Sequence, residues 1–205
     1  MKLALYGYGG HAREVAAQMN NKVEFYVDDE YTNDIAKPIS EFNPTTHQMM
    51  VAVANSKDRY DIVQKLPKKT TYFTFIHPTA IIGKYVTIGE GSFIGANSII
   101  TTSVIIGKHS LLNRGNHIGH DCIIKDYISM MPGSIISGNV NIGNKVYLGT
   151  NSSIKEELYV GDDITIGLNS GVVTSLLIPG VYVGTPSKII ETKFTDSLIL
   201  DRGVI

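Results

Sequence analysis

The sequence lacks several features that mark particular classes of protein. Its 205 residues include one cysteine and no tryptophan, and its 18 basic and 19 acidic residues leave a net charge of −1. A single cysteine cannot form an internal disulfide, which is typical of a reducing compartment. The balanced charge provides no basic excess to attract nucleic acid or an anionic membrane surface. We therefore expect neither of these partners.

Long apolar runs are missing as well. The N-terminal segment MKLALYGYGGHAREV has an apolar run of only four residues before a glycine-rich turn, which is too short for a signal peptide. No later run is long enough to cross a bilayer. The sequence therefore predicts a cytoplasmic protein without membrane insertion.

The second half contains a repeat of six residues. Stepping by six from Ile76 to Ile178 places an aliphatic side chain at eighteen consecutive positions, without an insertion. Glycine often follows that position, and the residue four further on is usually small or apolar. This period is typical of a parallel β-helix, in which three hexads form one triangular coil of about eighteen residues. The aliphatic side chains should point into this prism, and glycine should relieve the backbone at the turns.

The first 75 residues lack this repeat and have the pattern of alternating strands and helices. The strand KLALY leads into the turn GYGGH and an amphipathic helix, and the strand VEFYV ends at two aspartates. A third strand, MMVAVA, leads into NSKDR and a second helix. This order is a βαβ nucleotide-binding arrangement, in which a phosphate approaches the glycines and an acid meets the ribose or base. Because a full dinucleotide fold needs roughly twice this length, a mononucleotide site is favoured.

Both halves together resemble the sugar O-acyltransferase family of sialic acid and bacillosamine acetyltransferases, and UDP-4-amino-sugar N-acetyltransferases most of all. The motifs that carry the resemblance are GYGGH, VDD, AVANSKDR, the hexad repeat, GHDC, GNVNIG and VGTPSK. It implies a mixed fold with a small N-terminal βαβ (Rossmann-like) domain at 1–75 and a left-handed parallel β-helix of about six coils at 76–190. Residues 191–205 form a tail that matches no family motif.

The resemblance also implies an activity and an assembly. The expected reaction is acetyl-CoA-dependent N-acetylation of a nucleotide-linked amino sugar, of the 4-amino-4,6-dideoxy type and linked to UDP or dTDP, for glycan or surface polysaccharide biosynthesis. The expected assembly is a homotrimer with active sites between subunits.

The register of the repeat places the candidate catalytic residues on a corner of the prism. Ile118 and Cys122 should point inward, which leaves His120 and Asp121 accessible on and beside the corner. An imidazole can remove a proton from an attacking amine near neutral pH, and an adjacent carboxylate can orient the ring. By resemblance, His120 is the general base, Asp121 supports it, and Asn113 belongs to the same site.

The resemblance assigns two further sets of residues. The N–H of Gly138 matches a donor to the thioester oxygen, Ser129 stands where related enzymes carry a second histidine, and Lys188 offers a cation to the CoA phosphates. The full set expected along acetyl-CoA is Ser129, Gly138, Gly149, Gly167, Gly184, Pro186 and Lys188. The set expected around the nucleotide sugar is Gly7, Gly9, Gly10, His11, Asp28, Asp29 and Asn55.

Three alternatives stay open at this point. One is O-acetylation of a sugar such as sialic acid, and another is a scaffold with an inactive site, against which the intact His120–Asp121 pair argues. The third is a zinc hydro-lyase that resembles the γ-carbonic anhydrases. Its candidate ligands would be His109, His117 and His120, but they occupy the fourth, sixth and third positions of their hexads. They should therefore not converge within the ~2 Å that zinc ligation needs, and no metal is expected.

Overall fold

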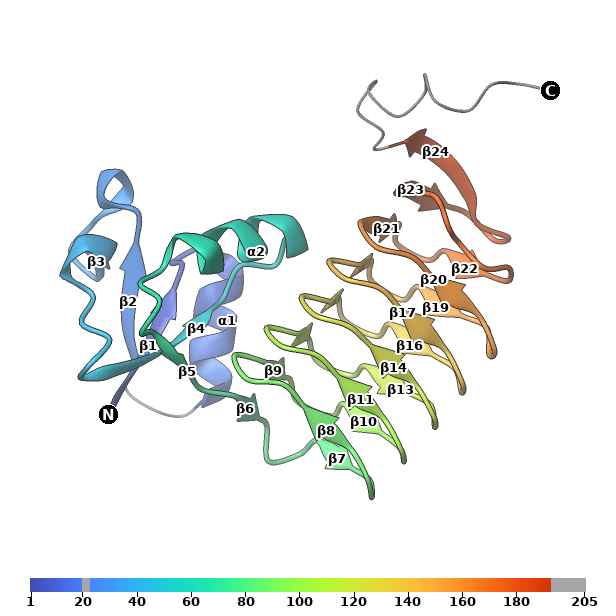
Figure 1. Cartoon of the computed structure of the whole chain (residues 1–205), viewed down its shortest axis with the longest axis horizontal. Helices are drawn as coiled ribbons and strands as arrows, with labels where there is room; N and C mark the ends of the chain where they lie inside the picture. The colour runs from blue at the N-terminus through green and yellow to red at the C-terminus, as the bar shows by residue number, and fades with distance from the viewer. Residues whose placement is uncertain (20–22, 193–205) are drawn as a thin grey trace.

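The structure, a computed structural model, describes residues 1–19 and 23–192 (Figure 1). The chain begins with a five-stranded parallel sheet of order β3-β2-β1-β4-β5. Its elements in chain order are β1 Lys2–Tyr6, α1 Gly10–Met19, β2 Val23–Val27, the 3₁₀ turn η1 Asp29–Tyr31, β3 Ala36–Pro38, the 3₁₀ turn η2 Ile39–Glu41, β4 His47–Val51, α2 Ser56–Lys65 and β5 Thr71–Tyr72.

The N-terminal sheet has a core on each face because successive side chains of its strands alternate. On one face Leu5 and Met50 pack with Val15 of α1, and this cluster extends to Phe93 of the second half. On the other face Tyr6 and Met49 pack with Leu66 and partly buried residues of α2. Among the described residues, no helix has the length and apolar content that a membrane span requires.

From β6 to β23 the chain winds into a left-handed parallel β-helix, as predicted, and β24 pairs antiparallel with β23. One sheet contains β7 Ile81–Ile82, β10 Ile99–Ile100, β13 His117–Ile118, β16 Ile135–Ile136, β19 Ser153–Ile154 and β22 Gly171–Val172. A second contains β8 Thr87–Ile88, β11 Ile105–Ile106, β14 Ile123–Ile124, β17 Asn141–Ile142 and β20 Tyr159–Val160. The third contains β6 Phe75–Ile76, β9 Phe93–Ile94, β12 Leu111–Leu112, β15 Ser129–Met130, β18 Tyr147–Leu148, β21 Ile164–Ile166, β23 Gly180–Val183 and β24 Lys188–Thr192.

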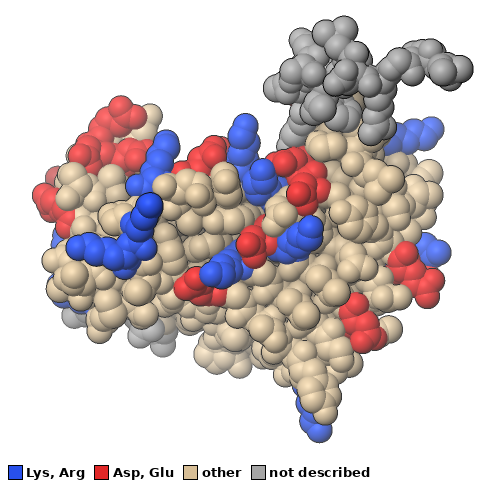
Figure 2. All heavy atoms as spheres, in the orientation of Figure 1, with Lys and Arg blue, Asp and Glu red and all other residues tan. Residues whose placement is uncertain are grey.

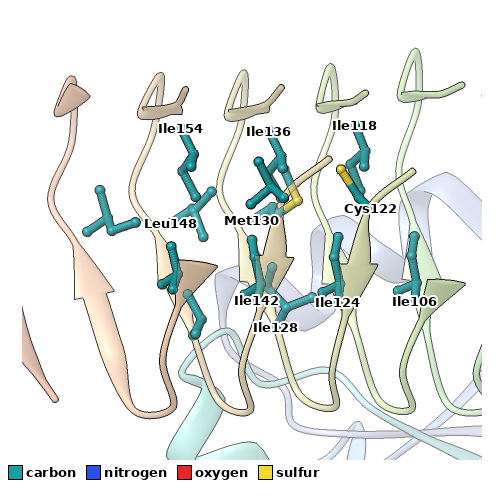
Figure 3. Packing of buried hydrophobic residues seen from close by; sticks show 14 of the residues in the cluster. Ile106, Ile118, Cys122, Ile124, Ile128, Met130, Ile136, Ile142, Leu148 and Ile154 are labelled. Atoms are coloured by element: carbon teal, nitrogen blue, oxygen red, sulfur yellow. The ribbon is translucent and has the colours of Figure 1, made fainter. Parts of the chain in front are cut away.

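The aliphatic column of the repeat forms the core of the prism. Its members from Ile94 to Val172 are at most 1% exposed and stack coil upon coil (Figure 3). The prediction is wrong at both ends of the column, because Ile76 is 42% and Ile178 45% exposed. Ile76 lies in the first coil, which has no coil beneath it. At the far end Val160 pairs with Leu176, so the register slips by two residues and Leu176 takes the buried place expected of Ile178.

The glycines that follow the aliphatic residues have a different role from the predicted one. None of them has a positive φ. A Cβ on Gly89, Gly119 or Gly149 would lie 2.5–2.6 Å from a backbone nitrogen of the next coil. They are therefore required because neighbouring coils approach closely. The left-handed backbone occurs two residues later, at every sixth residue from Tyr85 to Asn169, and mostly on residues other than glycine.

One face of the prism is covered by the N-terminal part of the chain. Outward-facing Phe93, Leu111 and Ser129 on this face are at most 2% exposed, whereas Ile105 and Ile135 on the other two faces are 52% and 42% exposed. Both helices contribute contacts. Gln18 of α1 accepts a hydrogen bond from the N–H of Ala96 (2.9 Å), Glu14 of α1 pairs with Arg114, and α2 reaches the prism through Arg59. Acidic and basic side chains alternate on the surface that Figure 2 shows, with no large area of one sign.

Candidate active site

His120 and Asp121 lie on a corner of the prism between β13 and β14. The Nδ1 atom of His120 is 2.7 Å from Oδ2 of Asp121, and the two side chains are 63% and 60% exposed. Ile118 and Cys122 on either side are buried, so the predicted register holds. Asp121 has a φ of 59°, a left-handed conformation that aspartate tolerates better than most residues. With Nδ1 held by the carboxylate, Nε2 is the ring nitrogen that can exchange a proton with a ligand.

Gly138 lies directly beside this imidazole, one coil further along. A Cβ on Gly138 would be 2.7 Å from both Cε1 and Nε2 of His120, so only glycine leaves room for the ring in this position. Within the described residues, the N–H of Gly138 has no hydrogen-bond acceptor. On another corner the corresponding N–H groups are bonded to side chains, as where Lys108 donates to Asp126 (2.7 Å) and Asn144 to Asp162 (2.7 Å). The corner at His120 thus combines a proton acceptor with a free backbone donor.

Two residues that were predicted for the site lie away from the corner of His120 in the folded structure. Asn113 is 3% exposed, and its side-chain oxygen accepts the N–H of Arg114 (2.7 Å) at a different corner of the triangle from His120. Ser129 is fully buried, and its hydroxyl is bonded to Ala54, Ser56 and Arg59. The expected contact of Ser129 with acetyl-CoA is therefore wrong in this structure, because the side chain that was expected to bind the ligand holds the N-terminal part against the prism.

The remaining histidines of the prism and its cysteine are separated from one another. His109 is buried between the rings of Tyr72 and Tyr127, with centroid distances of 4.5 and 5.1 Å. Burial, with a further contribution from Arg59, lowers the pKa of His109 to about 4. His117 is exposed on β13. Burial raises the pKa of the Cys122 thiol, which makes it a poor nucleophile. No three His, Cys, Asp or Glu side chains gather as a metal site in residues 1–19 and 23–192.

A hollow of about 380 Å³ opens at the carboxyl ends of β1 and β2. Ligands commonly bind at this edge of a parallel sheet. It includes three of the predicted nucleotide-binding residues, Gly7, Gly9 and Asp28, and Gly7 has a φ of 110° that favours glycine. The full lining is Tyr6, Gly7, Tyr8, Gly9, Val27, Asp28, Tyr31 and Asn33.

Three tyrosines in this lining were not predicted. The hydroxyl of Tyr6 donates to Asp28 Oδ1 (2.6 Å), and burial together with this carboxylate raises the pKa of Tyr6. Tyr8 is held edge-on against Phe25, with a centroid distance of 5.0 Å. Tyr31 is 66% exposed at the rim. Their positions at the glycine turn and just after the two aspartates were the available signal, because aromatic rings there can lie against a nucleobase.

The other predicted nucleotide-binding residues do not line the hollow. Gly10 begins α1, and His11 is partly buried, with a pKa lowered by burial and a buried Nε2 that has no partner within the described residues. Asp29 accepts the N–H of Ser40 (3.1 Å). Asn55 is the N-cap of α2, and its side chain accepts two backbone N–H groups.

The remaining residues predicted for acetyl-CoA form two groups. Gly149 and Gly167 lie above one another in neighbouring coils, where Gly149 is buried and Gly167 is half-buried. Gly184, Pro186 and Lys188 are exposed at the turn between β23 and β24. The structure therefore brings the second group together at the far end of the prism, while Gly149 has a packing role of its own.

No protein-family model and no curated protein matches the chain. Solved structures do. WeeI from Acinetobacter baumannii is 27% identical, with 93% of this chain and 100% of that chain covered and a TM-score of 0.83. The acetyltransferase domain of PglB from Neisseria gonorrhoeae is 25% identical, covers 92% and 99%, has a TM-score of 0.70, and was also solved in complex with acetyl coenzyme A.

A third similar structure shares the fold at lower identity. It is a mutant of perosamine N-acetyltransferase from Caulobacter crescentus in complex with CoA and GDP-perosamine. It is 22% identical, covers 92% of this chain and 96% of that chain, and has a TM-score of 0.83. The likeness to these structures runs over nearly the whole chain, including both the N-terminal sheet and the prism. It confirms the resemblance found in the sequence and the acyltransferase class that it implies: of these three solved structures, one is the acetyltransferase domain of PglB and another is a perosamine N-acetyltransferase.

Proposed function

We propose that the chain is an acetyl-CoA-dependent N-acetyltransferase that acts on an amino sugar linked to a nucleoside diphosphate. The observation that carries this proposal is the corner at His120. There an exposed imidazole is held by a carboxylate at 2.7 Å and lies against Gly138, whose N–H is free. A proton acceptor beside an uncommitted backbone donor is the set of groups that acyl transfer requires.

The geometry supports a direct transfer from thioester to amine. Nε2 of His120 removes a proton as the substrate nitrogen attacks the thioester carbonyl carbon, and Asp121 stabilises the imidazolium that forms. The N–H of Gly138 donates to the carbonyl oxygen, which gains negative charge in the tetrahedral intermediate. When the C–S bond breaks, the imidazolium returns its proton to the CoA sulfur. Each cycle therefore restores His120 without a metal or a covalent enzyme intermediate.

The hollow at Gly7 and Asp28 supports a nucleotide-linked acceptor. The glycine turn offers backbone N–H groups at the start of α1 to a diphosphate, and Asp28 with the nearby tyrosines offers polar and aromatic contacts to a nucleoside. A free monosaccharide would leave these groups unused. We retain His11, Asp29 and Asn55 as residues near this ligand, and Gly149, Gly167 and the Gly184–Lys188 turn as the path of acetyl-CoA.

We further propose that three chains assemble, so that a nucleotide sugar on one chain reaches His120 of a neighbour. Two faces of the prism expose rows of isoleucine, such as Ile81 (60%), Ile105 (52%), Ile123 (49%) and Ile135 (42%). Exposed apolar surface of this extent favours association. Asn113, at another corner of its own chain, could then approach His120 across an interface.

A panel of acceptors tests the proposal. Purified enzyme and acetyl-CoA are offered a 4-amino-4,6-dideoxy sugar linked to UDP, to dTDP or to GDP, and free sialic acid, while thiol release is followed. The GDP-linked compound is included because the perosamine enzyme was solved with GDP-perosamine. Release with one nucleotide-linked amino sugar, and its loss with the corresponding 4-hydroxy sugar, is the expected result. Thiol release with sialic acid alone would show that the enzyme is a sugar O-acetyltransferase and not an N-acetyltransferase.

A further inference from the structure

Arg59, near the start of α2, is a buried cation whose hydrogen-bond partners are all uncharged. Its side chain is 1% exposed. Within the described residues it has no carboxylate partner, and its guanidinium donates to backbone carbonyls and one hydroxyl. Burial lowers its pKa to about 9, so it remains charged at neutral pH. Because burying a charge without a counter-ion is costly, an apolar residue of similar size would pack here at a lower desolvation cost.

The guanidinium connects the end of β4 to two neighbouring coils of the prism. Nη1 donates to the carbonyl of Val53 (2.6 Å), which follows β4. Nε donates to the carbonyl of His109 (2.8 Å) in one coil. Nη2 donates to the carbonyls of Tyr127 (3.0 Å) and Ile128 (2.9 Å) in the next coil. Only the planar fork of arginine can reach three such directions at once, since lysine presents a single ammonium.

Two buried serines extend this connection to a third coil. The hydroxyl of Ser129 donates to the carbonyl of Ala54 (2.6 Å), and that of Ser56 lies within hydrogen-bond distance of both Ser129 Oγ (2.9 Å) and the carbonyl of Val146 (3.1 Å). We name the segment Val53–Ser56 the docking loop. It is bonded directly to two consecutive coils of the prism, at Ser129 and Val146, and through Arg59 to the coil of His109 before them.

The docking loop also lies next to the glycine turn of the proposed nucleotide site, where a Cβ on Gly7 would be 3.6 Å from Cγ2 of Val53. It follows β4, which pairs with β1 along its whole length, and the N–H of Ala52 donates to the carbonyl of Tyr6 (2.9 Å) just before the glycine turn. A Cβ on Gly7 would contact the carbonyl of Ala52 at 3.4 Å. The glycine turn and the docking loop are therefore both anchored to the same pair of strands, β1 and β4.

We propose that Arg59 is a positioning residue that fixes the nucleotide-binding turn relative to the prism of its own chain, and thereby relative to the acyl-transfer corner of the neighbouring chain that packs against that prism. This inference rests on the proposed function. A nucleotide anchored in the hollow delivers its sugar to a corner formed by prism residues, so any rocking of the N-terminal sheet on the prism moves the amine away from the thioester. A displacement of about 1 Å can cost roughly a hundredfold in rate.

The kinetic test compares an anchored acceptor with an unanchored one. The variants are Arg59→Lys and Ser129→Ala, with Lys65→Met as a control that removes an exposed charge from the same helix. Acetyl transfer from acetyl-CoA is measured to the best nucleotide-linked amino sugar and to hydroxylamine, which needs only the prism. We expect Arg59→Lys to lower kcat/KM for the nucleotide sugar at least tenfold, and to leave hydroxylamine acetylation and the Kd for acetyl-CoA within twofold of wild type. Equal losses on both acceptors, or no loss on either, would overturn the positioning role.

A distance measurement keeps the test independent of the proposed function. Spin labels at Lys57→Cys in α2 and Lys125→Cys on the prism report the distance between the two parts, with labelled chains diluted in unlabelled ones so that pairs within a chain dominate. The distribution should be narrow in the wild-type background and should broaden or shift with Arg59→Lys and Arg59→Met. An unchanged distribution would refute the inference. Transfer by the wild type to hydroxylamine but to no nucleotide-linked sugar would refute only the proposed function.

Discussion

Replacing Gly138 with alanine should lower catalytic activity while leaving thermal stability nearly unchanged. The new Cβ would lie 2.7 Å from Cε1 and Nε2 of His120, whereas ordinary van der Waals contact begins at 3.4 Å. The backbone of Gly138 is not in the left-handed region, so alanine introduces no conformational strain there. The clash falls on an exposed side chain that can rotate away, and the ring must therefore move by about 0.7 Å or more.

The expected cost follows from that displacement. Moving a general base by about 1 Å from its reacting position costs roughly a hundredfold in rate, so kcat should fall by about 10- to 100-fold. The melting temperature should change by less than about 2 °C, because no buried group is disturbed. Steady-state thiol release and differential scanning calorimetry on the same preparation measure the two effects.

Gly119→Ala provides the matched contrast. Its Cβ would lie 2.6 Å from the backbone nitrogen of Gly138 and 2.7 Å from the carbonyl carbon of Ser137, and backbone atoms cannot rotate away. This variant should therefore lose stability as well as activity. If Gly138→Ala retains wild-type kcat, the position of the His120 ring in this structure is not the reactive one. If it melts as early as Gly119→Ala, the coils tolerate a methyl group at Gly138 less well than the exposed position of the His120 ring implies.

The remaining predictions concern the base, the acyl donor and the N-terminal sheet. His120→Ala should lower kcat by about two to four orders of magnitude. Asp121→Ala should lower kcat by less, because the carboxylate orients the base without carrying the proton. Near-normal turnover of the His120 variant at neutral pH would refute the proposed mechanism. Lys188→Ala should raise the apparent KM for acetyl-CoA, and an effect on the sugar KM alone would show that the two ligands have been placed at the wrong ends. Hydrogen bonds from Lys2 and Lys37 lower the pKa of Glu24 to about 2 from 4.5. The stabilising contribution of Glu24 is present above pH 4.5 and is lost as the pH falls toward 2. The free energy of unfolding of Glu24→Gln, measured by urea unfolding, should therefore depend less on pH in that window than that of the wild type. An unchanged pH dependence would contradict the lowered pKa of Glu24.

The sequence predicts the prism well because each hexad repeats the same physical requirement, an inward aliphatic residue beside a close neighbouring coil. The exposed positions of the His120 and Asp121 side chains on a corner of the prism follow from that register alone. Ser129 could not be placed correctly, since its outward direction says nothing of which face the N-terminal part covers. That face is selected by contacts between residues far apart in the chain, such as Arg59 with His109, and no local pattern reports them.

The same limit applies to the nucleotide site. The glycine turn and the two aspartates are recognisable from their order along the chain, and Asp28 does line the hollow. Asn55 was expected to line it too, but an asparagine before a helix serves equally well as an N-cap, and that is the role observed. Local sequence cannot distinguish these two uses of one side chain.

The alignment of His120 with Gly138 places a constraint on how a chain of this kind can lengthen or shorten over evolution. The two residues are eighteen apart and therefore share a corner on adjacent coils. Loss of one hexad between them would preserve every inward aliphatic residue and the packing of the core, yet it would carry Gly138 a third of a turn away to another corner. Gain of three hexads would keep the corner but separate the pair by one further coil, roughly 4.8 Å. Whole coils can thus be added or lost on either side of this pair without breaking the site, while the seventeen residues between them are fixed in number by chemistry and not by stability.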